Sequence, residues 1–275
     1  MKLNVYTFQN HLRGYWSALF LAFLMIVGYS EFKTETFSSK GNTDISFETI
    51  QDANWESLFD GENLSGWRGL GRDHIPESHW IVEDGAIRKV ATDEVARVAD
   101  GQPVEGGDLL YDRTFKNFEL SLEWKVSPGA NSGIKYNVSE ELSTSHEPAF
   151  AALGFEYQIL DNELHPDAEN DPNRLAAGLY DLIPPGSNAS LNPVGTWNTG
   201  RIVFNGNKGE HWLNGEMVLE YELETYMMDR LLETSKWGDI PEFGARRDEG
   251  YIILQDHGDD VWFRNIRLRE LKSEQ

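Results

Sequence analysis

The sequence predicts an all-β fold, an antiparallel sandwich or jelly roll made of two sheets. Three observations point to this class. Short segments with alternating apolar and polar side chains recur along the chain, tight-turn dipeptides separate them, and residues 225–234 are the one segment with a helical pattern. Many short strands with hardly any helix favour a sandwich over an α/β architecture. We therefore expect a single domain of this kind over residues 55–272.

The N-terminal part of the 275-residue chain predicts export. Residues 1–30 carry few charges and contain an apolar run at 18–27 followed by small residues, which is typical of a signal peptide. The run is shorter than the ~20 residues that a membrane-spanning helix needs, so an uncleaved anchor is the alternative. Residues 31–54 are polar and predict a linker. We expect a periplasmic or extracellular protein.

The strand assignment depends on alternation. In residues 118–126 every second residue is apolar, which is typical of a half-buried strand with one face in water. The other segments that we expect to enter the sheets are, in chain order, residues 55–61, 80–87, 109–111, 134–138, 154–161, 197–204, 211–219, 251–258 and 261–269.

Two dipeptides predict tight hairpin turns. Asp84-Gly85 and Asn214-Gly215 each lie between apolar segments, and their residues tolerate the positive φ that such turns require. Longer polar segments predict loops, and these are residues 91–108, 139–150, 162–176 and 184–196.

The one predicted helix spans residues 225–234. Its spacing of apolar side chains suggests that Tyr226, Leu231 and Leu232 face the sheet.

Composition excludes several functions. The formal charge of −22 argues against nucleic acid and anionic membranes as partners, because both bind basic patches. The chain has no cysteine, so disulfides, thiolate metal sites and a cysteine nucleophile are excluded.

Two segments predict a polar site. In residues 154–161 the alternation places Glu156 and Gln158 on the face opposite the apolar side chains, with Asp161 at the end of the strand. Residues 251–258 have the same plan, an apolar run that ends in polar and titratable side chains before a glycine. For a single strand, such a face can simply meet water. Two strands of this kind predict a polar groove on an otherwise apolar sheet.

Motifs in a fixed order carry a resemblance to a known family. They are Phe59-Asp60-Gly61, Trp67, Asn131-Ser132-Gly133, Gly154-Phe155-Glu156-Tyr157-Gln158-Ile159-Leu160-Asp161, Gly195-Thr196-Trp197-Asn198, Trp212-Leu213-Asn214-Gly215, Leu254-Gln255-Asp256-His257-Gly258 and Phe263-Arg264-Asn265-Ile266. Over about residues 55–272 the chain resembles the 3-keto-disaccharide hydrolase family. The resemblance implies a concanavalin A-like fold and a lyase or hydratase acting on glycosides oxidised at the sugar 3-position. Unlike many members, this chain lacks a lipobox cysteine.

The implied chemistry assigns catalytic candidates. A 3-keto sugar has an acidified C2 hydrogen, so a base can remove it while an electrophile holds the enolate oxygen and an acid protonates the leaving oxygen. Glu156 is the candidate base and His257 the alternative. Lys236 is the candidate that polarises the ketone. Asp161 or Tyr180 is the candidate acid.

Five further residues are candidates for holding the substrate. Asn131, Gln158, Gln255 and Arg264 suit hydroxyl groups or the orientation of carboxylates, and Trp197 offers a ring face for stacking on a sugar. Structural roles are the alternatives, because Arg264 can pair with an acidic loop, Asn131 can form a turn, and Trp197 can belong to the core.

We expect no metal and no cofactor. A divalent cation held by His146, His165 and neighbouring carboxylates is the alternative, although the sequence shows no tight ligand spacing.

Two other functions remain open from the sequence. One is a classical glycosidase with Glu156 and Asp161 as its carboxylate pair, but five residues of extended strand separate them by roughly 16 Å, too far for either glycosidase geometry without a sharp turn. The other is a lectin-like module that only binds carbohydrate. The titratable set of Glu156, Asp161, Lys236 and His257 favours the enzyme, because sugar binding alone does not need it. Oligomeric state is left open.

Overall fold

The structure of the protein is a computed structural model. The residues that it describes are 54–76, 79–91, 107–146, 152–240 and 242–272. The predicted signal peptide at 1–30 and almost all of the predicted linker at 31–54 lie outside these residues. Within the described residues, no helix has the length and apolar character needed to cross a membrane.

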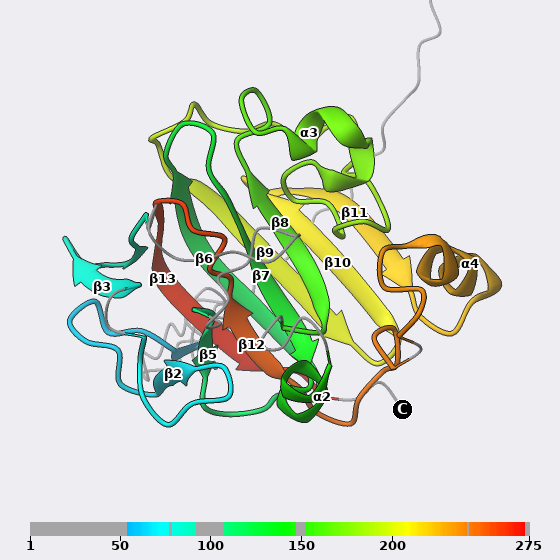
Figure 1. The fold of residues 1–275 in the computed structure, drawn as a ribbon, viewed down its shortest axis with the longest axis horizontal. Helices are drawn as coiled ribbons and strands as arrows, with labels where there is room; N and C mark the ends of the chain where they lie inside the picture. Colours follow the sequence, from blue (N-terminus) through cyan, green and yellow to red (C-terminus); the bar gives the residue numbers. More distant parts are fainter. Residues whose placement is uncertain (1–53, 77–78, 92–106, 147–151, 241, 273–275) are drawn as a thin grey trace, which may run out of the picture. The chain divides into compact units, whose positions relative to one another are not determined.

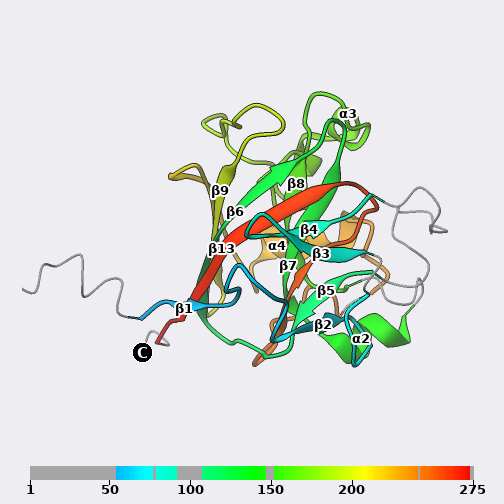
Figure 2. The same ribbon diagram turned by 90° about the vertical axis from the view of Figure 1, so that its left-hand side faces the viewer.

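Two antiparallel sheets make up the described fold (Figure 1). The larger sheet has eight strands, and one of them, β1 (Glu56–Ser57), lies off the main strand order and pairs with β13 (Val261–Glu270). Across this sheet the other strands are β11 (Glu216–Glu222), β10 (Lys208–Leu213), β9 (Asn198–Asn205), β6 (Phe118–Val126), β13 (Val261–Glu270), β4 (Ala86–Lys89) and β3 (Trp80–Glu83). Figure 2 shows the long β13 strand beside β6 and β4.

The smaller sheet has five strands. In order they are β2 (Trp67–Gly69), β5 (Leu109–Tyr111), β12 (Tyr251–Leu254), β7 (Asn131–Val138) and β8 (Phe155–Leu160). The strand pairs of both sheets are antiparallel. The predicted all-β fold, a two-sheet antiparallel sandwich of the jelly-roll type, is confirmed.

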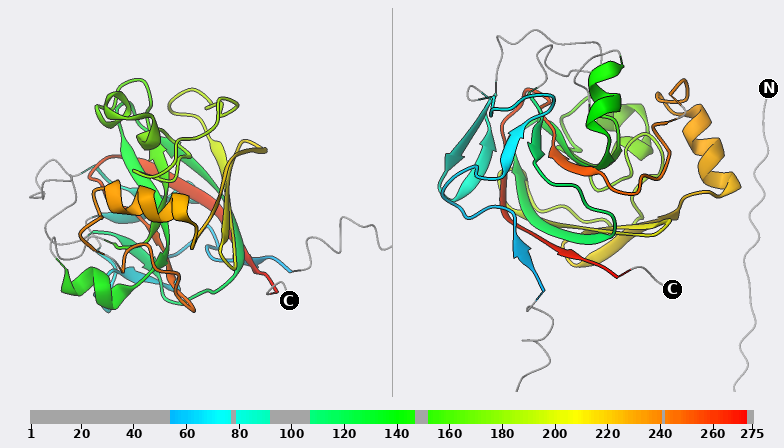
Figure 3. Two further views of the ribbon diagram at one scale, coloured as in Figure 1. Left: turned by 90° about the vertical axis from the view of Figure 1, so that its right-hand side faces the viewer. Right: turned by 90° about the horizontal axis from the view of Figure 1, so that it is seen from below.

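The core lies between the two sheets. Tyr136 of β7 in the smaller sheet packs edge-on against Phe118 and Phe204 of the larger sheet, with ring centroids 6.2 and 5.6 Å apart. Phe155 and Tyr157 of β8 are fully buried on the same side. In Figure 3 (right) the larger sheet curves beneath the smaller one. The alternation in β8 therefore turns its apolar residues inward and its polar residues outward.

Both predicted hairpin turns are confirmed. Asp84 and Gly85 have φ values of 50° and 73°, and Asn214 and Gly215 have φ values of 51° and 90°. These left-handed conformations match the twist of the strands that the turns join.

The predicted helix is α4 (Tyr226–Thr234), but its expected buried face is wrong at Tyr226. Tyr226 is 81% exposed, whereas Met228 is 2% exposed. The Thr225 side chain accepts a hydrogen bond from the Met228 N–H and so caps the helix, whose first residue is Tyr226. This phase turns Tyr226 to solvent. Three short helical segments lie in predicted loops, and they are α2 (Glu140–Ser145), α3 (Asp167–Asn170) and η1 (Pro172–Arg174).

Candidate active site

Polar side chains are buried together on the outer face of the smaller sheet, the face turned away from the core. The register pairs Lys135 with Glu156 and Gly133 with Gln158, and directly opposed residues of antiparallel strands share a face. None of the six members is more than 7% exposed. We call this set the outer-face cluster, and its members are Asp108, Asn131, Lys135, Glu156, Gln158 and Gln255.

A buried ion pair lies at the centre of the cluster. Lys135 Nζ is 3.7 Å from Glu156 Oε2 and donates a hydrogen bond to the Ala152 carbonyl at 3.2 Å. The carboxylate has room because Gly133 lies beside it on β7. A Cβ at Gly133 would be 2.5 Å from Glu156 Oε1, closer than atoms can approach.

Asp108, at the start of β5, adds a second carboxyl group to this region. Burial is the main cause that raises the pKa of Asp108 to about 7, with the Lys135 charge opposing the rise and the Glu156 charge adding to it. Asp108 Oδ1 accepts a hydrogen bond from the Asp256 N–H at 2.8 Å. Asp108 can therefore exchange a proton near neutral pH.

Asp256 itself points to the opposite side of β12 and forms a buried charged group there. Its two oxygens lie 2.8 Å from Lys89 Nζ and 2.7 Å from His79 Nδ1. Burial alone would raise the pKa of Asp256, but the hydrogen bond from His79 and the charge of Lys89 lower it overall. This pairing fixes the end of β12, from which Gln255 reaches the outer face.

Sequence reasoning found four members of the cluster and missed Lys135 and Asp108. Lys135 had a readable signal, since alternation along β7 places it on the same face as Asn131. Asp108 had no such signal, because it follows a long polar segment and only the pairing of β5 with β12 brings it to Glu156.

Gln158 has the features of a ligand-binding side chain. It is completely buried, and neither its amide nitrogen nor its amide oxygen has a hydrogen-bond partner among the residues that the structure describes. The same holds within this part of the chain for Oδ1 of Asn131. Buried amides that lack partners destabilise a fold by about 1–3 kcal/mol each. Such groups are expected where a polar ligand supplies the missing bonds.

Tyr180 and Lys236 lie beside the cluster. The Tyr180 N–H donates to the Glu156 carbonyl, and its hydroxyl donates to Asp167 Oδ2 at 2.9 Å. Burial raises the pKa of Tyr180, and the nearby Glu156 charge raises it further, so this hydroxyl stays protonated. Lys236 Nζ lies 4.5 Å from the centre of the Tyr180 ring, at the exposed rim.

The segment that carries Tyr180 is tied to the other sheet. His211 of β10 donates from Nδ1 to the Ala177 carbonyl at 3.1 Å and accepts at Nε2 from the Tyr136 hydroxyl at 2.8 Å. Tyr221 in turn lies 2.8 Å from the Tyr136 hydroxyl. Burial lowers the pKa of His211 to about 3, so the ring is neutral. The network holds Tyr180 against β8.

Asp161 has a different role from the predicted one. Its Oδ2 accepts from the Gly129 N–H, and its Oδ1 accepts from the N–H groups of Glu163 and Leu164. A carboxylate bound to three backbone donors caps the turn after β8 and has no geometry for donating a proton to substrate. We therefore assign Asp161 as a cap. This corrects its predicted role as the acid, and its predicted role as the carboxylate partner of Glu156 in a classical glycosidase.

Trp197 and Arg264 are not part of the cluster either. The Arg264 guanidinium stacks 4.0 Å from the centre of the Trp197 ring and binds Glu123 at 2.7 Å. Glu123 and Arg264 alternate with core residues of β6 and β13, so they lie on the outer face of the larger sheet. The sandwich separates this surface from Glu156. The structure thus places Trp197 and Arg264 on another surface than Glu156, and we do not assign their predicted roles in substrate binding to the outer-face cluster.

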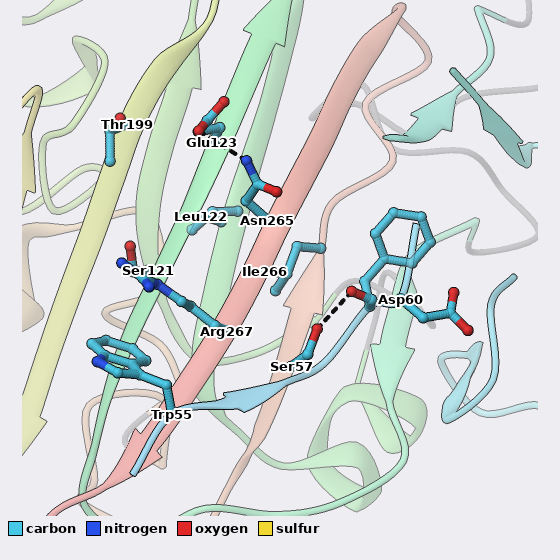
Figure 4. A pocket seen from close by; sticks show the side chains of 11 residues that line it. Trp55, Ser57, Asp60, Ser121, Leu122, Glu123, Thr199, Asn265, Ile266 and Arg267 are labelled. Atoms are coloured by element: carbon cyan, nitrogen blue, oxygen red, sulfur yellow. Dashed lines mark hydrogen bonds between the residues drawn. The ribbon is translucent and has the colours of Figure 1, made fainter. Parts of the chain in front are cut away.

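A cavity of about 690 Å³ lies on that outer face of the larger sheet (Figure 4). Figure 4 shows Glu123 hydrogen-bonded to Asn265, with Arg267 and Trp55 further along the same surface. Trp55 is stacked by the guanidinium of Arg267 at 4.8 Å. The Glu123 carboxylate is already bound here by Arg264 and Asn265.

His257 follows Gln255 at the end of β12 and lies beside His165. The two rings are 6.0 Å apart and nearly perpendicular. Asp259 completes a group in which one donor atom from each residue lies within 4.8 Å of the others. Asp259 Oδ2 also accepts from the Asn131 N–H at 3.0 Å, which places this group at the Asn131 end of the cluster. His146 is outside the group.

Comparison with known proteins identifies the family of the chain. A family model described as the 3-keto-alpha-glucoside-1,2-lyase-like domain matches residues 54–269. The chain belongs to this family. It is 42% identical over 232 residues to a protein of Bacteroides thetaiotaomicron named 3-keto-disaccharide hydrolase, covering 78% of each chain.

Solved structures support the fold of this 3-keto-glucoside lyase-like domain. Two crystal structures from Parabacteroides distasonis, both described as candidate glycosyl hydrolases, are similar to it. The first has a TM-score of 0.69 and 24% identity, covering 83% of this chain and 99% of its own. The second has a TM-score of 0.56 and 28% identity, covering 79% of this chain and 99% of its own.

Proposed function

We propose that the protein is an exported carbohydrate-active enzyme that cleaves 3-keto-glycosides by proton abstraction at C2 and β-elimination. The observation that carries the proposal is the pairing of a buried carboxylate, Glu156, with a buried ammonium group, Lys135. Beside them lies Gln158, whose amide has no hydrogen-bond partner in the part of the chain that the structure describes. The name of the Bacteroides thetaiotaomicron relative supports a 3-keto-disaccharide as the kind of substrate.

In the proposed reaction Glu156 takes the proton from C2. The electron pair of the C–H bond forms an enolate on the C3 oxygen, and its collapse forms a C1=C2 double bond as the C1–oxygen bond breaks. The departing oxygen takes up a proton. Water then adds across the double bond, with its oxygen at C1 and a proton returned to C2, so that the net result is hydrolysis. Together these steps need a base for the C2 proton, a positive group near the enolate oxygen and an acid for the departing oxygen.

Two cations are available for the enolate. Lys135 Nζ is buried and 3.7 Å from Glu156, whereas Lys236 lies at the exposed rim. A positive charge acts more strongly where water is excluded, so we assign the electrophilic role to Lys135 in preference to Lys236. We assign Asp108, whose burial raises its pKa to about 7, as the acid in preference to Tyr180, whose pKa burial raises much further.

The test compares a 3-keto-glucoside with its unoxidised parent. In Glu156→Gln the shape is kept and the base is lost, so turnover of the 3-keto-glucoside should fall by about 10²–10⁴-fold. The exposed Glu169→Gln is the matched control and should keep wild-type turnover. A Glu156→Gln enzyme of near-normal rate would move the base to another group. Efficient cleavage of the unoxidised glucoside would favour an ordinary glycosidase, because its C2 hydrogen is too weakly acidic for a carboxylate.

A further inference from the structure

The group formed by His165, His257 and Asp259 has the donor set of a transition-metal site. Two imidazoles and one carboxylate are the ligands of many sites for first-row divalent ions, which leave the remaining positions for water or substrate. The three residues are all half-buried, and their donor atoms lie within 4.8 Å of one another. They come from two separate loops, one after β8 and one after β12.

A second observation independently points to a ligand here. Oδ1 of Asn131, a residue that is 3% exposed, has no hydrogen-bond partner among the residues that the structure describes. The N–H of the same residue is bonded to Asp259 Oδ2, so the unpartnered oxygen belongs to a residue in direct contact with the group. An amide oxygen is a suitable further ligand for a divalent ion.

We propose that His165, His257 and Asp259 bind a first-row divalent transition ion at the Asn131 end of the outer-face cluster. The imidazoles favour ions such as Zn²⁺ or Co²⁺ over Mg²⁺ and Ca²⁺, which prefer oxygen ligands. Ligands in a tetrahedral site with bonds of ~2.1 Å lie roughly 3.4 Å apart. The three side chains therefore need to approach by at most about 1.4 Å from their maximum separation of 4.8 Å.

Binding has one structural consequence at His165. Its Nδ1 accepts a hydrogen bond from the Asp167 N–H at 3.1 Å, so the neutral ring carries its proton on Nε2. Coordination by Nε2 requires that proton to move to Nδ1, and coordination by Nδ1 displaces the donor directly. In either case the ion replaces the Asp167 hydrogen bond. The backbone amide of Asp167 at the start of α3 should therefore report the binding.

The position of the site suggests what the ion does. The role in the reaction rests on the proposed function, whereas binding of the ion does not. Along β7, Asn131 is two residues from Gly133, against which the Glu156 carboxylate lies, a separation of ~7 Å at ~3.3 Å per residue. The ion therefore lies beside the proposed base along the strand and not at its carboxylate. It is placed to hold oxygens of the sugar or aglycone, and His257 then acts as a ligand and not as a base.

The experiment measures Co²⁺ binding to chelator-treated protein at physiological salt, using the visible absorption of the ion to detect nitrogen ligands. One equivalent should bind with a visible band. His165→Gln, His257→Gln and Asp259→Asn should each weaken binding at least tenfold. His74→Asn, at an exposed histidine paired with Asp73, is the matched control and should bind normally. Unchanged circular dichroism establishes that each variant is folded.

Two results would overturn the site. One is wild-type protein that binds no Co²⁺, and the other is binding that survives in all three variants, which would assign it to the acidic surface. In a separate titration with Zn²⁺ in place of Co²⁺, the NMR resonance of the Asp167 backbone amide should shift in wild type. It should stay fixed in the folded Asp259→Asn variant. In kinetics with a 3-keto-disaccharide, removal of the ion should raise KM by at least fivefold with kcat changed less. A fall in kcat at constant KM would contradict the assigned position.

Discussion

The Glu156 carboxylate lies against Gly133 on the neighbouring strand, where a Cβ would be 2.5 Å from Oε1 and 2.9 Å from Cγ. The contact involves more than the tip of the side chain, so Glu156 cannot avoid an added methyl group by a small rotation. Glycine at position 133 is therefore required by the rotamer of the proposed base and not by the backbone, since Gly133 is absent from the positive-φ residues.

Gly133→Ala should therefore reduce activity through Glu156. We expect kcat to fall by about 10²-fold, because misplacing a catalytic group by about 1 Å has an effect of this size. In a double-mutant cycle with Glu156→Gln, the second substitution should add little to the first. The measurement is kcat for a 3-keto-glucoside in all four proteins. Additive losses would mean that Gly133 acts on something other than Glu156.

Lys135→Met should affect both activity and stability. It leaves Glu156 buried without its positive partner, and removal of one member of a buried pair destabilises proteins by about 3–5 kcal/mol. The free energy of unfolding, measured in urea, should fall accordingly. Lys116→Met is the matched control, because Lys116 pairs with Asp248 at 3.2 Å with both side chains well exposed. Equal effects at the two positions would show that burial of the pair is unimportant.

Stability should depend on pH through His211. Burial lowers its pKa to about 3 in the folded protein from an unfolded value of 6.5. Between these values the unfolded chain binds the additional proton, so the free energy of unfolding decreases as pH falls from 6.5 toward 3 and is fully present above 6.5. The expected loss is on the order of 4 kcal/mol over that window.

The check compares urea unfolding of wild type and His211→Gln at pH 7.5 and pH 4.5. Glutamine keeps a donor for Ala177 and an acceptor for Tyr136, and it does not titrate. The advantage of wild type over the variant should shrink at the lower pH. Asp108, whose burial raises its pKa to about 7, titrates with the opposite sign but is present in both proteins and cancels. A constant difference would exclude His211 as the titrating group.

Arg264→Ala should leave catalysis unchanged. Arg264 stacks on Trp197 on the outer face of the larger sheet, and the whole sandwich lies between this pair and Glu156. We expect kcat and KM for a 3-keto-glucoside within twofold of wild type. The stacking and the Glu123 ion pair are partly exposed, so the stability cost should be about 1 kcal/mol or less. A large rise in KM would return Arg264 to the substrate site.

The fold was predictable because its strands and turns depend on residues that are close together in the sequence. Strict alternation defined β6 and β8, and Asp84-Gly85 and Asn214-Gly215 have the dihedral freedom that their turns need. The helix α4 was also found, but its phase depends on the Thr225 cap, which a count of apolar residues does not capture.

The site was only partly predictable because it depends on which strands become neighbours. Alternation found Glu156 and Gln158, which share one strand. It could not find Asp108, because that contact exists only through the pairing of β5 with β12. It also could not assign Arg264 to the opposite surface, since residues of both sheets alternate in the same way. Asp161 was predicted as a catalytic acid and instead caps a turn. Its partners are backbone N–H groups, and their direction depends on the conformation of that turn.

The bond from His211 to the Ala177 carbonyl has a consequence for redesign. It makes one wall of the site part of the hydrophobic core, so enlarging the site by loosening residues 176–183 would cost folding stability. Lys236 is exposed at the rim and stacks on the outer side of Tyr180. Libraries aimed at bulkier glycosides should therefore vary position 236 and its exposed neighbours, and keep Ala177 and His211 fixed as scaffold.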